Sequence, residues 1–281
     1  METNIGNSVF ISYRRDTSAF IARAVFQDLR AHSIDVFMDV ESIDAGEFEK
    51  IILNQIAARP YFLVILAPGT LDRCSEPGDW LRREIEHAMD LNRVIIPVMT
   101  SNFNFDASRP FLTGKLAALP RYQALSIPHD YFEAAMDRLR TRYLKAINLQ
   151  IKPAPVADQS IVQRKLEQAD AAPPVTERQL SAQDLFEQAL IRYMKNDKDG
   201  SVTIYKKALK LNPLFAEAYA ALGLAYRDLG NHLGAVESFH AALELQPDHP
   251  LATEMHSFIA AQRTTLLQDP PVIAGPPKRN P

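Results

Sequence analysis

The chain has 281 residues, of which 47% are hydrophobic, so we expect two domains and at least one sizeable core. Its formal net charge is −3, and no cluster of Lys and Arg is interleaved with aromatic residues, which argues against a nucleic-acid partner. The sequence has no signal-peptide pattern and no long apolar run, so a cytoplasmic protein without membrane contact is expected. The single cysteine, Cys74, cannot form an internal disulfide, and the 7 histidines lack metal-ligand spacing, so no metal site is expected.

Short apolar runs alternate with helical patterns in the first half of the chain. Four of the runs read "VFISY", "VFMDV", "YFLVILA" and "VIIPVM". This alternation is typical of a parallel sheet covered by helices on both faces, and the length accommodates five strands and five helices. We therefore predict an α/β domain over residues 1–147 with a flavodoxin-like, five-stranded parallel sheet. In such sheets ligands bind beyond the carboxyl ends of the strands, where residues 14–16, 39–48 and 68–79 lie.

Residues 148–180 carry two proline clusters and little apolar content, which is typical of a linker. A short helix at 159–170 is compatible with the pattern. A linker would separate two cores, so a chain ending near residue 150 is expected to fold by itself.

The rest of the chain is helical in pattern and repeats with a period of 34 residues. The run "AEAYAALGLAYRDLGNHLGAVESFHAALELQP" at 216–247 resembles a tetratricopeptide (TPR) repeat closely, and a weaker copy precedes it with Gln188 and Arg192 at positions where Leu and Tyr are usual. A terminal repeat departs in this way when one face meets solvent. We predict an all-α array over 181–267, made of two repeats and a capping helix at 250–267, and a disordered tail at 268–281. Side chains such as Tyr193 and Arg227 are expected to be available to a peptide or to another copy of the chain.

The first half of the chain resembles a Toll/interleukin-1 receptor (TIR) domain. The resemblance rests on "FISYRR", "FMDVESIDAGEFE" and "LDRCSEPGDWLRREI", and it is greatest to the NAD-cleaving branch that includes SARM-like and bacterial TIR proteins. It implies an NAD+ glycohydrolase, whose catalytic glutamate ends a W-x-x-x-E motif. That motif places Glu84 one helical turn after Trp80, the only tryptophan of the chain.

Glu84 and Trp80 have a functional and a structural interpretation. A carboxylate beside the ribose stabilises the positive charge that develops when nicotinamide leaves, and an indole can stack on the pyridinium ring. Alternatively, Trp80 packs against the core, and Glu84 is a solvated carboxylate paired with Arg82 or Arg83.

Further candidates follow the first two strands. Arg14 and Arg15 can engage the phosphates or ribose of a dinucleotide, or they form an ordinary surface pair. By resemblance, residues 39–48 form the mobile BB loop, in which Asp39 orders the end of the strand and Phe48 lies at the ligand pocket; Phe48 can equally pack with Ile52. In the same loop, Asp44 and Gly46 are expected to mediate assembly between TIR domains.

NAD+ is expected as a consumed substrate rather than a cofactor, because the chain lacks the glycine-rich motifs of Rossmann and P-loop proteins. The leading hypothesis is an NAD+ glycohydrolase activated by self-assembly through its TIR domains, with repeats that bind a partner, in bacterial immune defence. Two alternatives stay open: a non-enzymatic adaptor that only binds proteins, and a cyclase in which a group of the substrate replaces water.

Overall fold

The computed structural model describes residues 5–38, 47–128, 131–145, 147 and 149–268. It divides into two compact units, Met1–Pro213 and Leu214–Pro281. In the described residues, no helix is both long and apolar enough to cross a membrane.

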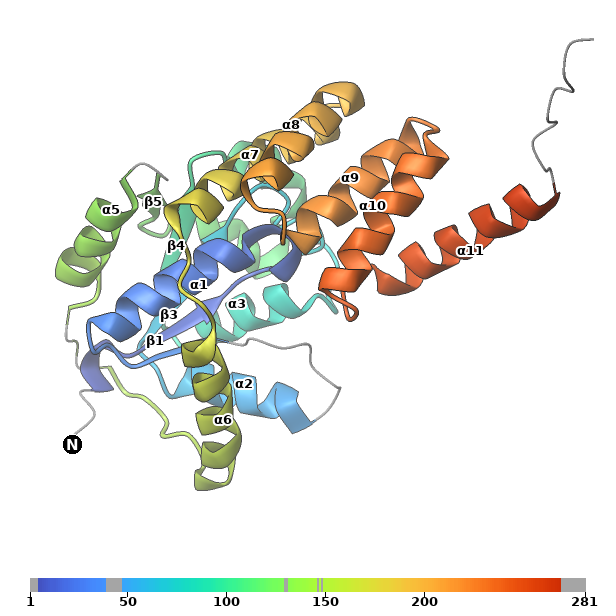
Figure 1. The fold of residues 1–281 in the computed structure, drawn as a ribbon. Coiled ribbons are helices and arrows are strands. Elements are labelled where there is room, and N and C mark those ends of the chain that lie inside the picture. Colours follow the sequence, from blue (N-terminus) through green and yellow to red (C-terminus); the bar gives the residue numbers. More distant parts are fainter. Residues whose placement is uncertain (1–4, 39–46, 129–130, 146, 148, 269–281) are drawn as a thin grey trace, which may run out of the picture. The chain divides into compact units, whose positions relative to one another are not determined.

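A five-stranded parallel sheet in the order β2-β1-β3-β4-β5 forms the centre of the first unit (Figure 1). The strands are β1 (Val9–Ser12), β2 (Val36–Met38), β3 (Tyr61–Leu66), β4 (Val94–Thr100) and β5 (Leu125–Ile127). In register, Val9 of β1 lies between Val36 of β2 and Tyr61 of β3. The predicted α/β class with a five-stranded parallel sheet is thus confirmed.

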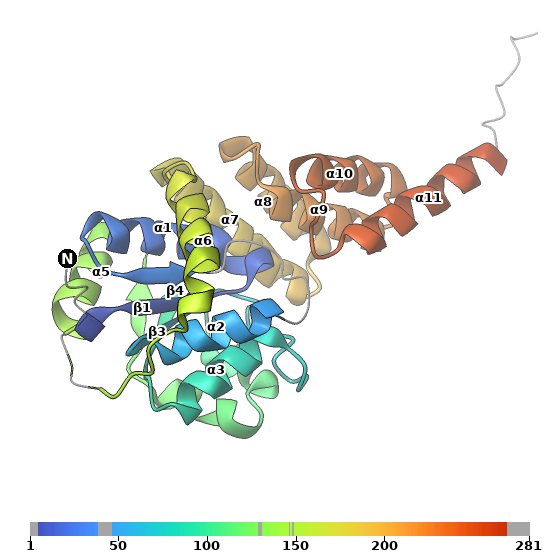
Figure 2. The same cartoon turned by 90° about the horizontal axis from the view of Figure 1, so that it is seen from below.

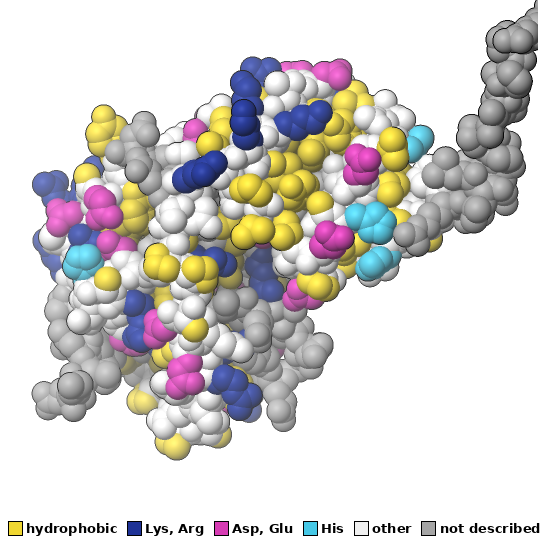
Figure 3. Space-filling view, in the orientation of Figure 1, with side chains coloured by type: hydrophobic (Ala, Val, Ile, Leu, Met, Phe, Trp, Pro, Cys, Tyr) yellow, Lys and Arg dark blue, Asp and Glu magenta, His cyan; other side chains and the backbone are white. Residues whose placement is uncertain are grey.

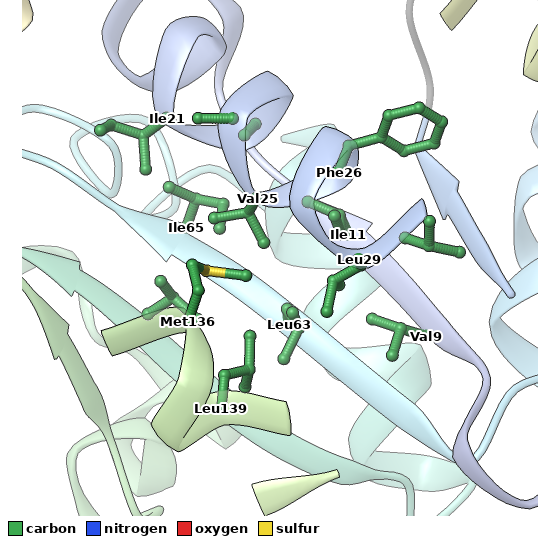
Figure 4. Packing of buried hydrophobic residues seen from close by; sticks show 14 of the residues in the cluster. Val9, Ile11, Ile21, Val25, Phe26, Leu29, Leu63, Ile65, Met136 and Leu139 are labelled. Carbon is green, nitrogen blue, oxygen red and sulfur yellow. The ribbon is translucent and has the colours of Figure 1, made fainter. Parts of the chain in front are cut away.

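Helices cover both faces of this sheet, as Figure 2 shows for α1 on one side of β1 and for α2 and α3 on the other. The helices of this part are α1 (Arg15–Ala31), α2 (Glu47–Ala57), α3 (Trp80–Asp90), α4 (Phe105–Ser108) and α5 (Phe132–Arg138). Successive residues of β1 point to opposite faces, so Val9 and Ile11 pack with α1 and α5 (Figure 4), while Phe10 packs with α2 and α3. The sheet is therefore buried on both sides, as its continuous apolar strands require.

The segment that the sequence indicated as a linker packs onto the sheet. It contains the helix α6 (Gln159–Ala171), which contacts the edge strand β2. Val162 of α6 packs with the core cluster on the α2 and α3 side, Ala169 belongs to the cluster on the α1 side, and Leu166 contacts both. This placement covers an edge strand whose backbone would otherwise be open to pairing. The division between compact units accordingly falls after Pro213 and not within 148–180.

The helices α7 (Glu177–Met194) and α8 (Lys198–Leu211) complete the first unit as a helical hairpin. Leu180 of α7 belongs to the core cluster on the α1 side of the sheet. Because α6 and α7 both supply core residues, a chain ending near residue 150 would lack part of the core. This differs from the expectation that such a chain holds a complete core.

The second unit consists of α9 (Ala216–Asp228), α10 (His232–Leu245) and α11 (Ala252–Gln268). Gly223 allows α9 and α10 to approach closely, since a Cβ there would lie 2.4 Å from the Phe239 ring. Met255 and Ile259 of α11 pack with the α9–α10 cluster, which is the capping arrangement that the sequence predicted. Arg227 forms an ion pair with Glu254 of α11. The tail from residue 269 lies outside the described residues.

Most of the exposed large hydrophobic side chains among the described residues belong to the helices from α7 onward or to the turns that join them (Figure 3). They are Met194, Leu214, Leu229, Leu233 and Leu245.

Candidate active site

Glu84 lies buried at the carboxyl end of β1, the strand between β2 and β3. Its side chain is 5% exposed, and its Oε2 accepts a hydrogen bond of 2.5 Å from the hydroxyl of Ser12, the last residue of β1. Leu81, Ile85 and Ala88 of the same helix pack into the core and thereby fix the rotation of α3 about its axis. The alternative of a solvated Glu84 is therefore wrong.

The two arginines beside Glu84 have other partners. Arg82 forms an ion pair with Glu86, and Arg83 forms one with Glu49 of α2. Glu84 thus faces the carboxyl edge of the sheet, while Arg82 and Arg83 form their ion pairs on the outer side of α3.

Asp79 starts the helix that carries Glu84. Its carboxylate accepts the backbone N–H of Arg82 at 3.0 Å, which makes it the N-cap of α3, and it binds the Arg14 guanidinium at 2.9 Å. Burial raises the pKa of Asp79, but the Arg82 N–H and the Arg14 charge outweigh it and hold that pKa below its usual value. Asp79 is therefore ionised near neutral pH and links Arg14, the residue before α1, to the start of α3.

Arg14 is directed into the protein. It is 7% exposed, and its Nε donates to the Thr70 carbonyl at 2.6 Å in addition to the ion pair with Asp79. Burial disfavours its charge, yet the carboxylate of Asp79 raises the pKa of Arg14 overall. Arg14 is not an ordinary surface residue. Its contacts with Thr70 and Asp79 occupy N–H donors that were expected to bind the phosphates or ribose of a dinucleotide.

Trp80 is half-buried and packs against the core cluster on the α2 and α3 side. The guanidinium carbon of Arg83 lies 5.0 Å from its ring centroid, so one face of the indole already carries a cation. Within the described residues the indole N–H has no hydrogen-bond partner. Trp80 thus combines a packing contact with a ring that attracts cations.

The remaining candidates lie at the starts of α1 and α2 or outside the described residues. Arg15 is the first residue of α1 and is half-buried. Phe48 belongs to α2, but its side chain is outside the described part, as are Asp39, Asp44 and Gly46. Their predicted roles at the pocket and in assembly stay predictions.

Cys74 is fully buried next to this site. Burial, reinforced by the neighbouring Asp79, raises the pKa of its thiol to about 12. A thiol with that pKa is not a nucleophile at neutral pH, so Cys74 contributes packing and hydrogen bonds with Asp79 and Arg14. Among the described residues, no group of three or more acidic, His or Cys side chains could hold a metal ion.

A cavity of about 350 Å³ opens beside the carboxyl ends of β3 and β4. Its lining residues are Pro68, Gly69, Asp72, Asn102, Phe103, Asn104, Ala107, Ser108, Ile191, Met194 and Lys195. Trp80 and Glu84 are not among them, so this cavity is distinct from the site around Glu84.

Three residues of the site were not singled out from the sequence: Ser12, Thr70 and Asp79. Asp79 carried a usable signal, because an aspartate immediately before a helical pattern is typical of an N-cap. Ser12 and Thr70 carried none, since their roles depend on partners 72 and 56 positions away.

Models of known protein families match both halves of the chain. A model of the TIR domain family matches residues 9–140, and models of TPR repeats match residues 189–230 and 216–249.

Three relatives with known names match about half of this chain. The NAD(+) hydrolase tir-1 of Caenorhabditis elegans is 31% identical over 134 residues, or 47% of this chain and 14% of that protein. The NAD(+) hydrolase sarm1 of Drosophila melanogaster is 32% identical over 140 residues, or 49% and 10%. The NAD(+) hydrolase SARM1 of Danio rerio is 30% identical over 151 residues, or 53% and 21%. The chain therefore spans only a tenth to a fifth of the length of these relatives.

The sheet order, the hairpin geometry and these matches agree. Residues 9–140 of this chain form a TIR domain, and residues 189–249 form tetratricopeptide repeats.

Proposed function

We propose that the TIR domain hydrolyses NAD+ at the bond between nicotinamide and ribose. The observation that carries the proposal is the buried carboxylate of Glu84, held by Ser12 at the carboxyl end of β1. Ligands of open parallel sheets bind at this edge. The similar proteins named NAD(+) hydrolases support the choice of substrate.

The chemistry accounts for a carboxylate without a general acid. Nicotinamide leaves NAD+ as a neutral molecule, so the leaving group needs no proton, while positive charge develops on the ribose. An ionised Glu84 beside the ribose stabilises that charge, and the Ser12 hydroxyl holds the carboxylate in one orientation. Water then adds to the ribose carbon and releases a proton, which gives ADP-ribose. If a hydroxyl or adenine nitrogen of the substrate attacks instead, the product is a cyclic ADP-ribose.

Trp80 and Arg15 would divide substrate binding between them. The half-buried indole can stack on the pyridinium ring, with an attraction on the order of 0.5 to 2 kcal/mol. The attraction fades as the ring becomes neutral, so Trp80 serves binding more than rate acceleration. Arg15 remains the candidate for the phosphates or ribose, whereas Arg14 positions α3 through Asp79.

Self-assembly is part of the proposal. Glu84 is 5% exposed in the single chain, so the ribose reaches it only after neighbouring residues move. A second TIR domain can favour the open arrangement by binding it selectively. The exposed apolar side chains of the repeats would then serve to recognise a protein partner.

The test is Glu84→Gln, which keeps the shape of the side chain and removes its charge. We expect NAD+ cleavage to fall by at least about a thousandfold, followed as nicotinamide and ADP-ribose species by chromatography, with an unchanged circular dichroism spectrum. Glu86→Gln on the same helix is the matched control and should retain activity. The assay is run over a hundredfold range of protein concentration with light scattering alongside.

Each result decides one component of the proposal. Turnover that survives Glu84→Gln would reject Glu84 as the catalytic group. Absence of cleavage by the unmodified chain at every concentration would favour the adaptor. Constant specific activity in a monomeric sample would reject control by assembly.

A further inference from the structure

The first repeat helix, α7, contacts the first turn of α1 and the loop between β3 and α3. Gln183 is 1% exposed, and its Nε2 donates to the Thr17 carbonyl in the first turn of α1 at 2.8 Å. Two turns later, Leu190 lies over Gly69, so that a Cβ built on Gly69 would be 3.3 Å from its Cδ2. The φ of Gly69 is +82°, and a side chain there would be strained as well as crowded. The α7 helix thus holds both the start of α1 and the loop between β3 and α3.

These two places are joined to each other beneath α7. The hydroxyls of Thr17 and Thr70 form a hydrogen bond of 3.0 Å, and the Thr70 hydroxyl also accepts the backbone N–H of Ala67 at 3.0 Å. Thr70 is fully buried. A displacement of the first turn of α1 would therefore leave buried polar groups unpaired, which is unfavourable.

The same loop is joined to the start of α3. The Thr70 carbonyl accepts from Arg14, Arg14 binds Asp79, and Asp79 caps the helix that carries Trp80 and Glu84. Every connection in this series is a hydrogen bond or ion pair of 3.0 Å or less, and each involves a buried side chain. Rigid, fully paired connections of this kind fix the place of a helix end more tightly than loop contacts alone.

Gln183 is itself held in one orientation on the α7 side. Its amide also donates to Glu187 Oε1 at 3.2 Å, and Glu187, which has no exposed surface, is contacted by Asn102 of the loop after β4. Asn102 additionally donates to Asp184 at 2.7 Å. The buried face of α7 is thus also fastened to the loop after β4, within the turn that follows Gln183.

We propose that Gln183 and Leu190 are positioning residues for the active site: through Thr17, Thr70, Arg14 and Asp79 they set where α3 begins and thereby where Trp80 and Glu84 lie. The repeat hairpin α7–α8 then contributes to catalysis by positioning the residues of the active site. This inference rests on the proposed NAD+ hydrolysis. Displacements of about 1 Å at a catalytic group can cost on the order of a hundredfold in rate, so loss of this support should be visible in kcat.

The experiment replaces Gln183 in the full chain by Met, which keeps its length and removes its donors. The matched control is Gln188→Met on the same helix, because the Gln188 amide donates to Asp184 within α7. We expect Gln183→Met to lower kcat by about tenfold and Gln188→Met to leave it within about twofold. Trp80 is the only tryptophan of the chain, so its emission maximum and its quenching by acrylamide report the start of α3 independently of activity.

A second pair of variants keeps the inference testable if Gln183→Met does not fold. Leu190→Ala removes the contact over Gly69 and should lower kcat and increase the quenching of Trp80, whereas Leu190→Met should restore both. Loss of stability alone would shift the unfolding midpoint without changing kcat or Trp80 emission of the folded protein. Wild-type values of kcat, KM and Trp80 quenching in Gln183→Met and Leu190→Ala would overturn the inference. If the unmodified chain does not cleave NAD+, the proposed function fails, and Trp80 quenching still decides whether α7 positions α3.

Discussion

The helical hairpins α7–α8 and α9–α10 have the same repeat pattern but different surroundings. Residues 34 positions apart correspond: Tyr205 and Phe239 are both buried, and Asn196 and Gly230 both have positive φ, at 65° and 74°. The first hairpin packs on the TIR domain within one compact unit, whereas the second packs against α11 in the other. Equivalence in sequence therefore does not imply an equivalent structural role.

The difference originates in two positions of the first helix. Gln183 and Glu187 of α7 are buried against the TIR domain, while the corresponding residues of α9, Glu217 and Ala221, are half-buried. Gln188 and Arg192 stand where Leu and Tyr are usual in the repeat, and both have partners within the hairpin. Gln188 donates a hydrogen bond to Asp184, and Arg192 forms an ion pair with Asp197. The buried polar face of α7 thus distinguishes the copies better than the missing repeat residues do.

The largest effect is expected from truncating the chain between the two hairpins or before both of them. A chain ending at Pro213 retains every helix of the first unit, whereas a chain ending near residue 150 loses Ala169 and Leu180 from its core. We expect the longer fragment to unfold cooperatively in urea and the shorter one to lose that cooperativity or to aggregate. Equal midpoints for the two fragments would show that α6 to α8 add nothing to the TIR core.

A smaller effect concerns the pH dependence of the first unit. Burial raises the pKa of Glu187 from 4.5 to about 7, and hydrogen bonds to Gln183 and Asn102 only partly oppose it. Between these two values the unfolded chain releases the proton while the folded chain keeps it, so rising pH favours unfolding. The free energy of unfolding should fall by about 3 kcal/mol at most across this range and change little through this group above it.

The measurement is the urea midpoint of the first-unit fragment ending at Pro213, at pH 5 and pH 8, compared with Glu187→Gln, which cannot ionise. We expect the fall in the urea midpoint between pH 5 and pH 8 to be mostly absent in Glu187→Gln. Glu217→Gln, the matching position of the second hairpin, is the control in the full chain and should not change the pH dependence. An unaltered decline in Glu187→Gln would assign it to another group.

A still smaller effect tests how closely the helices of each hairpin approach. Gly223→Ala places a Cβ 2.4 Å from the Phe239 ring, whereas the first hairpin already has Ala189 at the corresponding position. We expect Gly223→Ala to destabilise the second unit by about 2 kcal/mol while the unfolding of the first unit is unchanged. Differential scanning calorimetry that resolves the two units would measure this, and a stabilised second unit would show that Phe239 can move aside.

The smallest effect lies in the turns between the paired helices. Asn196→Gly relieves a positive φ that glycine adopts freely, and Gly230→Asn introduces the opposite change. Each should alter stability by less than about 1 kcal/mol, with Asn196→Gly stabilising and Gly230→Asn destabilising. Changes of the same sign in both variants would contradict the equivalence of the two turns.

The local patterns of the sequence determined much of this protein. Continuous apolar strands alternating with helices predicted a parallel sheet, and the 34-residue period predicted the repeats, because both depend on neighbouring residues and fixed geometry. The spacing of Trp80 and Glu84 likewise placed them one helical turn apart. The strand Leu125–Ile127 was not located, because it offers only two apolar residues, separated by Ser126, instead of a continuous apolar run.

Tertiary structure decided how these parts fit together. Glu84 accepts a hydrogen bond from Ser12, which is 72 residues away, Arg14 binds Asp79 instead of solvent, and α6 covers the edge of the sheet. Likewise, only the fold shows that Gln183 meets Thr17, 166 residues earlier. Hydrophobic periodicity shows which face of an element is buried, but the partner on that face depends on the order of strands and the path of the chain.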